Sequence, residues 1–282
     1  MTTPPTDSPE FALLQDIARE LSVGEVIFPT FVEVTMRIRE LVNDPNLSMN
    51  RIAKMVAGDP LLAARVVRLA NAAAYKASSD TITDLGFAVT RIGLDTLRSL
   101  MYAIAISQLR VSKELARYQD ISRKLWEHSL ETAALAHVIA KKCSRIPPDK
   151  AMLAGLVHDI GAFYLFYRLA VAPHGIPDSQ LISLVYQWHE EIGYAVLSAL
   201  DQPQEIVEAV KSHDVPREIT VIRHLADVVY LANLYAGLDT RWYADESVEY
   251  QHPAALELAG VSLNEIIEES RAEIEEIKAA FT

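Results

Sequence analysis

Cysteine is nearly absent from this sequence, which has Cys143 as its only one. A single cysteine excludes an intramolecular disulfide and favours a reducing compartment. Long apolar runs are also missing: stretches such as residues 100–106 are far shorter than the roughly 18 residues that a membrane span needs. The first ten residues contain neither a basic stretch nor an apolar run, so they do not resemble a secretory signal. We therefore expect a cytoplasmic, globular protein without a membrane partner.

Positive charge is scarce in the last third of the chain. The formal net charge of the 282 residues is −12, and residues 201–282 contain 17 acidic and 6 basic side chains. Nucleic-acid binding normally shows as clustered Lys and Arg, which this balance does not offer. Residues 49–71 resemble a helix-turn-helix with Arg65 and Arg68 on the second helix, but that helix has few polar side chains to read bases. DNA is therefore not expected as a partner.

Alternating runs of β-branched residues and Gly/Ser-rich linkers are absent as well. Apolar residues recur instead at spacings of three and four, which predicts an all-α protein. Asp59 before Pro60 predicts one helix start, and Ser262 with Glu265 forms the capping box of another. We predict an amino-terminal helical bundle over residues 8–112, packed on a bundle of longer helices over 119–238, and a carboxy-terminal helical extension over 253–282.

The last predicted helix, residues 262–281, has apolar side chains along one side. This pattern predicts that the helix docks on the body of the protein or on a partner helix, which includes the option of a homo-oligomer. The residues of this apolar stripe are Leu263, Ile266, Ile267, Ser270, Ile274, Ile277 and Phe281.

Histidine is concentrated in the second predicted bundle, which contains seven of the eight in the sequence. Helical spacing places His128 in the apolar stripe of residues 119–143. His137, nine residues further on, falls on the opposite face, and we expect it to be exposed. Stepping along the other segments gives a set of inward-facing polar residues, namely His128, His158, Asp159, His189, His213 and Asp227.

Two interpretations of this set remain open. A single inward histidine is usually a core residue with a hydrogen-bonded, neutral ring. Six such residues from five helical segments, however, suggest one shared polar site. Imidazole and carboxylate are the ligands that suit a divalent transition metal of the iron or manganese type, and facing helices commonly assemble such sites. Nothing indicates a nucleophilic enzyme, because no histidine is fixed near Cys143 by sequence and no glycine-rich phosphate loop is present.

Four blocks of the sequence resemble a known family. They are "FPTFVEVTMRIRELVNDPNLSMNRIAKMVAGDPLLAARVVRLANAAAY", "AVTRIGLDTLRSLMYAIA", "LWEHSLETAALAHVIA" and "AGLVHDIGAFYLF". In this order they look like the HDOD domain, the HD-related output domain of bacterial signalling proteins, over about residues 20 to 235. The resemblance implies an all-α fold in which an amino-terminal bundle packs on an HD-like bundle, and a role in signal transduction through a protein partner.

The wider HD superfamily contains metal-dependent phosphohydrolases, whose ligands follow the order His, His-Asp, distant Asp. The resemblance places these on His128, His158, Asp159 and Asp227, and the two-metal HD-GYP relatives would add His189 and His213. His224, one turn before Asp227, would be a supporting partner. If the chain is an enzyme, Asp159 would be a metal ligand or the catalytic base.

Three departures from the hydrolase pattern favour a signalling module. Ala162 stands where a lysine commonly follows the HD motif, so a cation that would stabilise phosphoryl charge is missing. Position 213 is followed by Asp214, and no GYP loop precedes His189. We expect an output module that binds a signalling partner and is gated by a metal or small ligand. The alternative is a phosphohydrolase that acts on a nucleotide or cyclic dinucleotide.

Overall fold

The computed structural model describes residues 5, 8–26, 48–75, 81–171, 176–240, 257–258 and 261–282. Much of the first block of the family resemblance, over residues 27–47, lies outside this set. So do His174 and His252, to which the sequence assigns no role.

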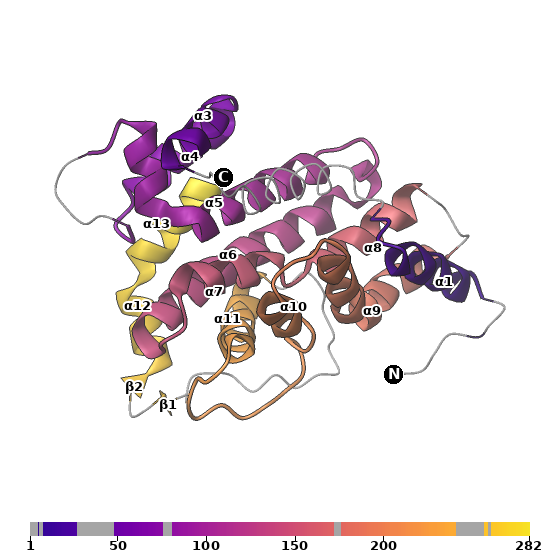
Figure 1. Ribbon diagram of the computed structural model, residues 1–282. Helices are drawn as coiled ribbons and strands as arrows, with labels where there is room; N and C mark the ends of the chain where they lie inside the picture. The colour runs from indigo at the N-terminus through magenta and orange to yellow at the C-terminus, as the bar shows by residue number, and fades with distance from the viewer. Residues whose placement is uncertain are drawn as a thin grey trace.

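The described chain is helical except for one two-stranded ladder, so the all-α prediction is confirmed (Figure 1). The short strands β1 (Glu257–Leu258) and β2 (Val261–Ser262) pair antiparallel. The helices are α1 (Pro9–Ser22), α3 (Met49–Ala57), α4 (Pro60–Ala70), α5 (Leu85–Arg110), the 3-10 turn η1 (Ala116–Tyr118), α6 (Gln119–Cys143), α7 (Pro148–Val157), α8 (Ile160–Val171), α9 (Asp178–Ala199), α10 (Gln204–Val210), α11 (Leu225–Thr240), α12 (Leu263–Glu269) and α13 (Arg271–Phe281).

Local chemistry explains several of the helix boundaries. Asp59 Oδ1 accepts hydrogen bonds from the N–H groups of Leu61 and Leu62, which caps α4 as predicted. Ser262 Oγ accepts from the Glu265 N–H at 3.5 Å and caps α12. Inside α5, Gly93 has a φ of 77°, a conformation that suits glycine, and this residue divides the helix at a kink.

Helix α6 is the central element of the molecule (Figure 1). Helices α7 and α11 pack against it, and α12 and α13 also contact it. Because neighbours surround α6, most of its length from Leu125 to Ala140 is buried. The helix can therefore carry polar side chains into the interior from more than one face.

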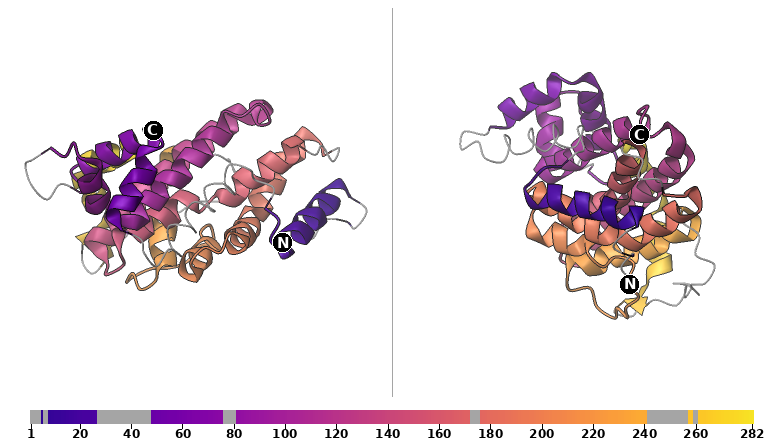
Figure 2. Two further views of the ribbon diagram at one scale, coloured as in Figure 1. Left: turned by 45° about the horizontal axis from the view of Figure 1, so that its top comes forward. Right: turned by 90° about the vertical axis from the view of Figure 1, so that its right-hand side faces the viewer.

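Helices α3, α4 and α5 form a second packed group, which joins the HD-like helices through contacts of α5 with α6 and α7. Helix α1 lies at the other end of the molecule, against α9, and Glu20 of α1 forms an ion pair with the buried Arg168 of α8 (Figures 1 and 2). The first predicted bundle, residues 8–112, is thus spread over two ends of the structure.

The carboxy-terminal segment docks on the body, one of the two outcomes that its apolar stripe predicts. Leu263, Ile267, Ile274, Ile277 and Phe281 are all buried. The single helix expected over 262–281 is wrong in one detail, since it breaks at Ser270 into α12 and α13. The Ser270 hydroxyl donates to the Ile266 carbonyl at 2.7 Å, a local bond that competes with helix continuation.

The arginines of the helix-turn-helix-like stretch face this carboxy-terminal helix. Arg68 Nη1 donates to the Ala279 carbonyl at 2.7 Å, and Arg65 Nη2 donates to the Thr282 carbonyl at 3.0 Å. Cations at a helix carboxyl end satisfy its free carbonyl groups and its dipole. These two side chains are therefore already engaged within the chain.

The expectation that His137 is exposed is wrong, because the residue is only 3% exposed. The face of α6 opposite His128 is covered by α13, whose Glu273 Oε1 lies 3.8 Å from His137 Nε2. Periodicity alone could not reveal this second buried face.

In the described part of the chain, no helix combines the length and the apolar character that crossing a membrane requires.

Candidate metal centre

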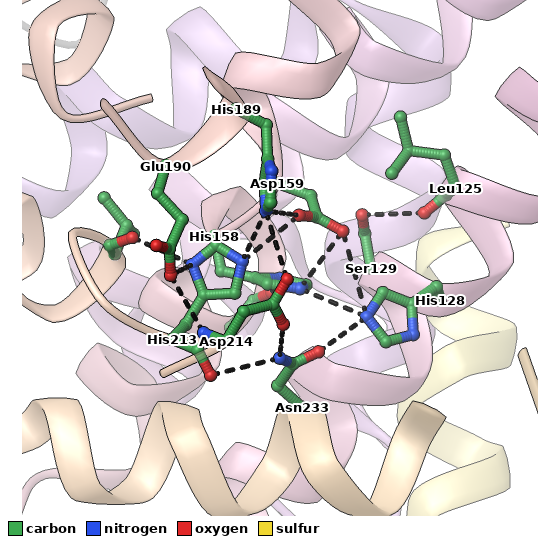
Figure 3. A network of polar contacts seen from close by, with 12 residues as sticks. Leu125, His128, Ser129, His158, Asp159, His189, Glu190, His213, Asp214 and Asn233 are labelled. Atoms are coloured by element: carbon green, nitrogen blue, oxygen red, sulfur yellow. Dashed lines mark hydrogen bonds and ion pairs between the residues drawn. The ribbon is translucent and has the colours of Figure 1, made fainter. Parts of the chain in front are cut away.

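Four imidazole rings and one carboxylate meet in the interior between α6, α7, α9 and α11 (Figure 3). His128 comes from the middle of α6, and His189 from α9. His158 and Asp159 lie at the junction where α7 ends and α8 begins, and His213 lies one turn beyond α10. These five residues are at most 3% exposed, so the cluster is sealed from bulk water.

The rings form two pairs that turn their Nε2 atoms toward each other. His128 Nε2 lies 3.2 Å from His158 Nε2, and His189 Nε2 lies 3.2 Å from His213 Nε2. Nitrogen atoms at this spacing can act on one common group, whether a proton or a metal ion.

The carboxylate of Asp159 lies between the two pairs, with one oxygen toward each (Figure 3). Oδ2 is 3.3 Å from His158 Nε2 and 3.8 Å from His128 Nε2. Oδ1 is 3.3 Å from His213 Nε2 and 3.5 Å from His189 Nε2. Asp159 therefore belongs to two groups of three donors, and in each group the donor atoms lie within 4.8 Å of one another.

Backbone carbonyl groups fix the orientation of three rings. The Nδ1 atoms of His158, His189 and His213 lie 2.7 to 2.8 Å from the carbonyl oxygens of Gly155, Tyr186 and Val210. Since a carbonyl oxygen only accepts, each Nδ1 carries the proton and donates it. Where such a ring is neutral, its Nε2 carries a lone pair directed into the cluster, which is the form in which histidine binds metals.

This arrangement requires a positive charge between His189 and His213. Two neutral rings would face each other with unshared lone pairs 3.2 Å apart, next to the Asp159 carboxylate. A proton or a cation placed there removes the repulsion between the lone pairs and pairs with the carboxylate. The donor set therefore fits a metal ion on its own chemistry.

The pKa values of His189 and His213, the second pair, also indicate that a positive charge is stable there. Burial alone would lower the pKa of His213, but the hydrogen bond to Asp159 and the charges of Asp214, Asp159 and Glu190 outweigh it and raise the pKa to about 10. Burial likewise opposes the charged form of His189, yet Asp214 and Asp159 raise its pKa above the ordinary value. These carboxylates stabilise positive charge at this pair.

His128 of the first pair behaves in the opposite way. Burial and the neighbouring charge of His158 lower the pKa of His128 to about 4. For Asp159, burial would raise the pKa, but the charge of His158 and the hydrogen bonds from His158 and His213 hold it well below its usual range. The site thus has an ionised carboxylate beside a neutral His128, whose Nε2 has to release the proton that it donates to Asn233 Oδ1 before it binds a metal.

Asp214, Asn233 and Glu190 surround the cluster and were not predicted as site residues. Asp214 Oδ2 lies 3.4 Å from His189 Nε2. Asn233 of α11 donates from Nδ2 to Asp214 Oδ1 at 2.8 Å, which leaves its Oδ1 2.8 Å from His128 Nε2. Glu190 Oε1 accepts from the Asp214 N–H at 2.9 Å. Two features of the sequence could have identified these residues as part of the site. Asp214 and Glu190 directly follow His213 and His189, and Asn233 interrupts an apolar run.

The structure brings together five of the six predicted residues and places the sixth elsewhere. His128, His158, Asp159, His189 and His213 form the cluster, whereas Asp227 belongs to neither of the donor groups found among the described residues. Asp227 Oδ2 accepts from the N–H groups of Arg223 and His224 at 2.9 Å and so holds the start of α11. The side chain that α11 presents to the cluster is Asn233, and His224 is exposed.

Two glycines of the "AGLVHDIG" segment allow the helices to approach closely enough to form the cluster. A β-carbon on Gly155 would lie 2.8 Å from the Thr132 carbonyl oxygen of α6. A β-carbon on Gly161 would collide with the His189 carbonyl oxygen of α9. These two close approaches set the distance of His158 from His128 and of Asp159 from His189.

This combination of an all-α, HD-like fold with a buried His/Asp cluster defines the class of protein: an HD-superfamily helical domain with a candidate metal site. In a comparison with sequence models of protein families, the model of the HDOD domain family matches residues 28–216. The match covers well over half of the chain, so the chain belongs to the HDOD family. The resemblance seen in the sequence is therefore confirmed, although the matched region ends before Asn233.

Solved structures with the same fold come from several bacteria. A protein from Shewanella amazonensis SB2B, whose name proposes a metal-dependent phosphohydrolase, is 26% identical with a TM-score of 0.70, covering 97% of this chain and 99% of that one. An HDOD domain protein of unknown function from Geobacter sulfurreducens is 24% identical with a TM-score of 0.58, covering 88% and 90%. A protein from Marinobacter aquaeolei VT8, whose name proposes signal transduction, is 20% identical with a TM-score of 0.56, covering 99% and 67%.

Among curated proteins, the chain matches an uncharacterized protein of Treponema pallidum (strain Nichols) at 22% identity over 222 residues. The match covers 73% of this chain but 41% of that protein. The chain therefore spans about two fifths of the length of its curated relative.

Proposed function

We propose that this protein is an HDOD-type output module of bacterial signal transduction, which acts by binding a protein partner and is gated by a divalent metal in its HD-like helices. The observation that carries the proposal is the convergence of four imidazole Nε2 atoms on Asp159 in an interior where no ligand is more than 3% exposed. His128, His158, Asp159, His189 and His213 would hold the metal, next to oxygens of Asn233 and Asp214 that lie 2.8 Å from His128 Nε2 and 3.4 Å from His189 Nε2.

The burial of the site favours a regulatory role for the metal over catalysis. A phosphorylated substrate has to reach the metal directly, and ligands that are 0 to 3% exposed offer no such surface without movement of the helices. Ala162, buried in α8, also supplies no cation for a phosphoryl group. A metal held by residues of α6, α9 and the α7–α8 junction would instead fix the relative positions of those helices, and with them the surface offered to a partner.

The second candidate function is hydrolysis of a nucleotide or cyclic dinucleotide. One observation favours it. Each oxygen of Asp159 faces its own histidine pair, so this one carboxylate belongs to two groups of metal-binding donors. Bound metal would supply an activated water. Among the residues of this chain, Asp214 and Glu190 are the more exposed edge of the cluster, at 15% and 11% of their side chains, and are placed to orient a substrate entering there.

Metal analysis of matched variants tests the proposal. The purified wild type, His158→Ala, Asp159→Ala and Asp227→Ala are compared by elemental analysis and by thermal melting before and after chelation. We expect the wild type and Asp227→Ala to bind metal and to lose melting temperature on chelation, because Asp227 holds the start of α11 and not the cluster. The other two variants should bind none. A wild type without metal under metal-replete conditions would overturn the proposal.

Hydrolysis assays separate the two candidates. The same four proteins are incubated with nucleoside phosphates and cyclic dinucleotides. Turnover by the wild type that disappears in Asp159→Ala and persists in Asp227→Ala would establish the phosphohydrolase. Metal binding without turnover would establish that the metal acts in regulation.

A further inference from the structure

A second candidate site lies between two loops, one at the carboxyl end of α6 and one at the amino end of α11. The loop between α6 and α7 and the loop that leads into α11 border an open hollow of about 650 Å³, within the range of small-molecule sites. Its lining residues are Lys142, Cys143, Ser144, Arg145, Ile146, Ile222 and Arg223.

The hollow is strongly positive in a protein with a net charge of −12. Lys142, Arg145 and Arg223 are exposed, and none of the lining residues is acidic. Within the described part of the chain, none of these three cations forms an ion pair, whereas Arg98, Arg123 and Arg168 are each paired with an acidic side chain. Three unpaired cations around one concavity create a local field that attracts anions.

Internal hydrogen bonds hold the backbone on both walls of the hollow. Ser144 Oγ donates to the Ala140 carbonyl at 2.9 Å and accepts from the Ile146 N–H at 3.1 Å, which shapes the loop on either side of Arg145. On the facing wall, Asp227 Oδ2 binds the N–H groups of Arg223 and His224 at 2.9 Å. The backbone that carries the three cations is thus fixed before a ligand binds, and only the exposed side chains have to be ordered.

We propose that this hollow binds a phosphate-bearing small molecule. Two guanidinium groups and an ammonium group match the charge of a diphosphate, and the planar fork of arginine donates two hydrogen bonds to phosphate oxygens. Ile146, Ile222 and the half-buried Cys143 supply an apolar wall beside the cations. The ligand class is therefore a polyphosphate, either inorganic or attached to an apolar or aromatic group as in a nucleoside diphosphate.

The site is separate from the His/Asp cluster and does not depend on metal. None of its lining residues belongs to the donor groups around Asp159. An Asp159→Ala variant should therefore keep the binding of phosphate ligands even if it loses metal, so that failure of this proposal and failure of the proposed function can be told apart.

Calorimetric titration with inorganic pyrophosphate and with ADP tests the proposal. Arg145→Ala and Arg223→Ala should each weaken binding by about tenfold, and the effect should decrease as salt is added. Arg123→Ala is the matched control. Arg123 is also exposed, but it lies near the amino end of α6, away from the hollow, and is paired with Glu127. The altered side chains are exposed, so all three variants should melt like the wild type.

The outcomes are distinct. Equal affinity for both ligands identifies the inorganic polyphosphate group as what is recognised, and tighter binding of ADP shows that the apolar wall takes the nucleoside. Binding of both ligands weaker than about 1 mM would overturn the proposal. A loss in Arg123→Ala as large as in Arg145→Ala would also overturn it, since the attraction would then be general charge and not this site.

Discussion

His137 differs from the four clustered histidines in having two carboxylates just beyond hydrogen-bond reach. Its Nδ1 is 3.7 Å from Asp149 Oδ1, and its Nε2 is 3.8 Å from Glu273 Oε1. Each acid already has another partner, since Tyr75 donates to Asp149 at 2.6 Å and Lys141 donates to Glu273 at 2.7 Å. Burial lowers the pKa of His137, and the charges of Asp149 and Glu273 only partly oppose this effect.

A pH-dependent loss of stability follows from this lowered pKa. Below about pH 6.5, the unfolded chain binds a proton at residue 137 that the folded protein resists, so the contribution of His137 to stability is present above that pH and is lost as the pH falls. His137→Phe should flatten the dependence, with a difference from wild type of at most about 1.4 kcal/mol per pH unit. Thermal or urea unfolding of chelator-treated protein measures this difference in stability between about pH 7.5 and about pH 5.5. These limits lie about one unit on either side of the ordinary pKa of histidine.

Replacement of the exposed His224 by alanine is the control, and it should leave the pH profile of the wild type unchanged. If the profiles of wild type and His137→Phe coincide, the buried ring does not take part in proton linkage.

At the residue scale, helical periodicity was sufficient to find most of the cluster. His128, His158, Asp159, His189 and His213 each fall on an apolar face, and polar residues on such faces need partners, which here are one another. The same spacing also selected Asp227, which the motif order of the resemblance supported because that order specifies an acid, and it did not select Asn233. The sequence could not show that this carboxylate binds the N–H groups ahead of its own helix.

Between elements, the contact of α8 with α9 is set by two glycines that face each other. A β-carbon on Gly161 would collide with the backbone of α9 at His189 and Gly193. A β-carbon on Gly193 would meet its nearest neighbour, the Gly161 backbone nitrogen, at 3.4 Å, an ordinary contact. The same contact can therefore be perturbed strongly from one side and weakly from the other.

Gly161→Ala should push α9 away and separate His189 from Asp159. We expect a loss of about 1–3 kcal/mol of unfolding free energy, together with weaker metal binding. Gly193→Ala, on the opposite side of the contact, should cost much less and should keep the metal. Chemical denaturation and elemental analysis of both variants check this, and similar losses in the two would show that the close approach of α8 and α9 is not what positions His189.

Element boundaries were predictable where a side chain marks them, as at Asp59 and Ser262. Breaks within apolar segments were not. The run over residues 151–166 reads as one helix, yet His158 and Asp159 stand between α7 and α8. Ser270, whose hydroxyl binds back to Ile266, similarly divides the last helix without a proline or glycine. Both breaks depend on local bonds that apolar periodicity does not record.

Across the whole molecule, the carboxy-terminal helices connect parts that are distant in sequence. Helix α13 contacts α4, α5 and α6, and its charged residues pair with the body: Lys278 with Glu131, and Glu273 with Lys141. The sequence predicted that this segment would dock, but not where, because its apolar stripe fits any exposed helical face. The position of α13 in turn explains why His137 is buried and why Arg65 and Arg68 are engaged.

Phe281, the last residue of α13, therefore should stabilise the whole protein and not only its own helix. The side chain is among the largest that are fully buried, at 1% exposure, beside the helix end that Arg65 and Arg68 cap. Phe281→Ala should lower the unfolding free energy by about 3–5 kcal/mol in a single cooperative transition. Glu275→Ala, which removes an exposed side chain from the same helix, should stay within about 0.5 kcal/mol of wild type. Urea denaturation followed by circular dichroism separates the two variants. If Phe281→Ala unfolds at the wild-type midpoint, α13 is a passive appendage, and the covering of His137 by α13 has no energetic consequence.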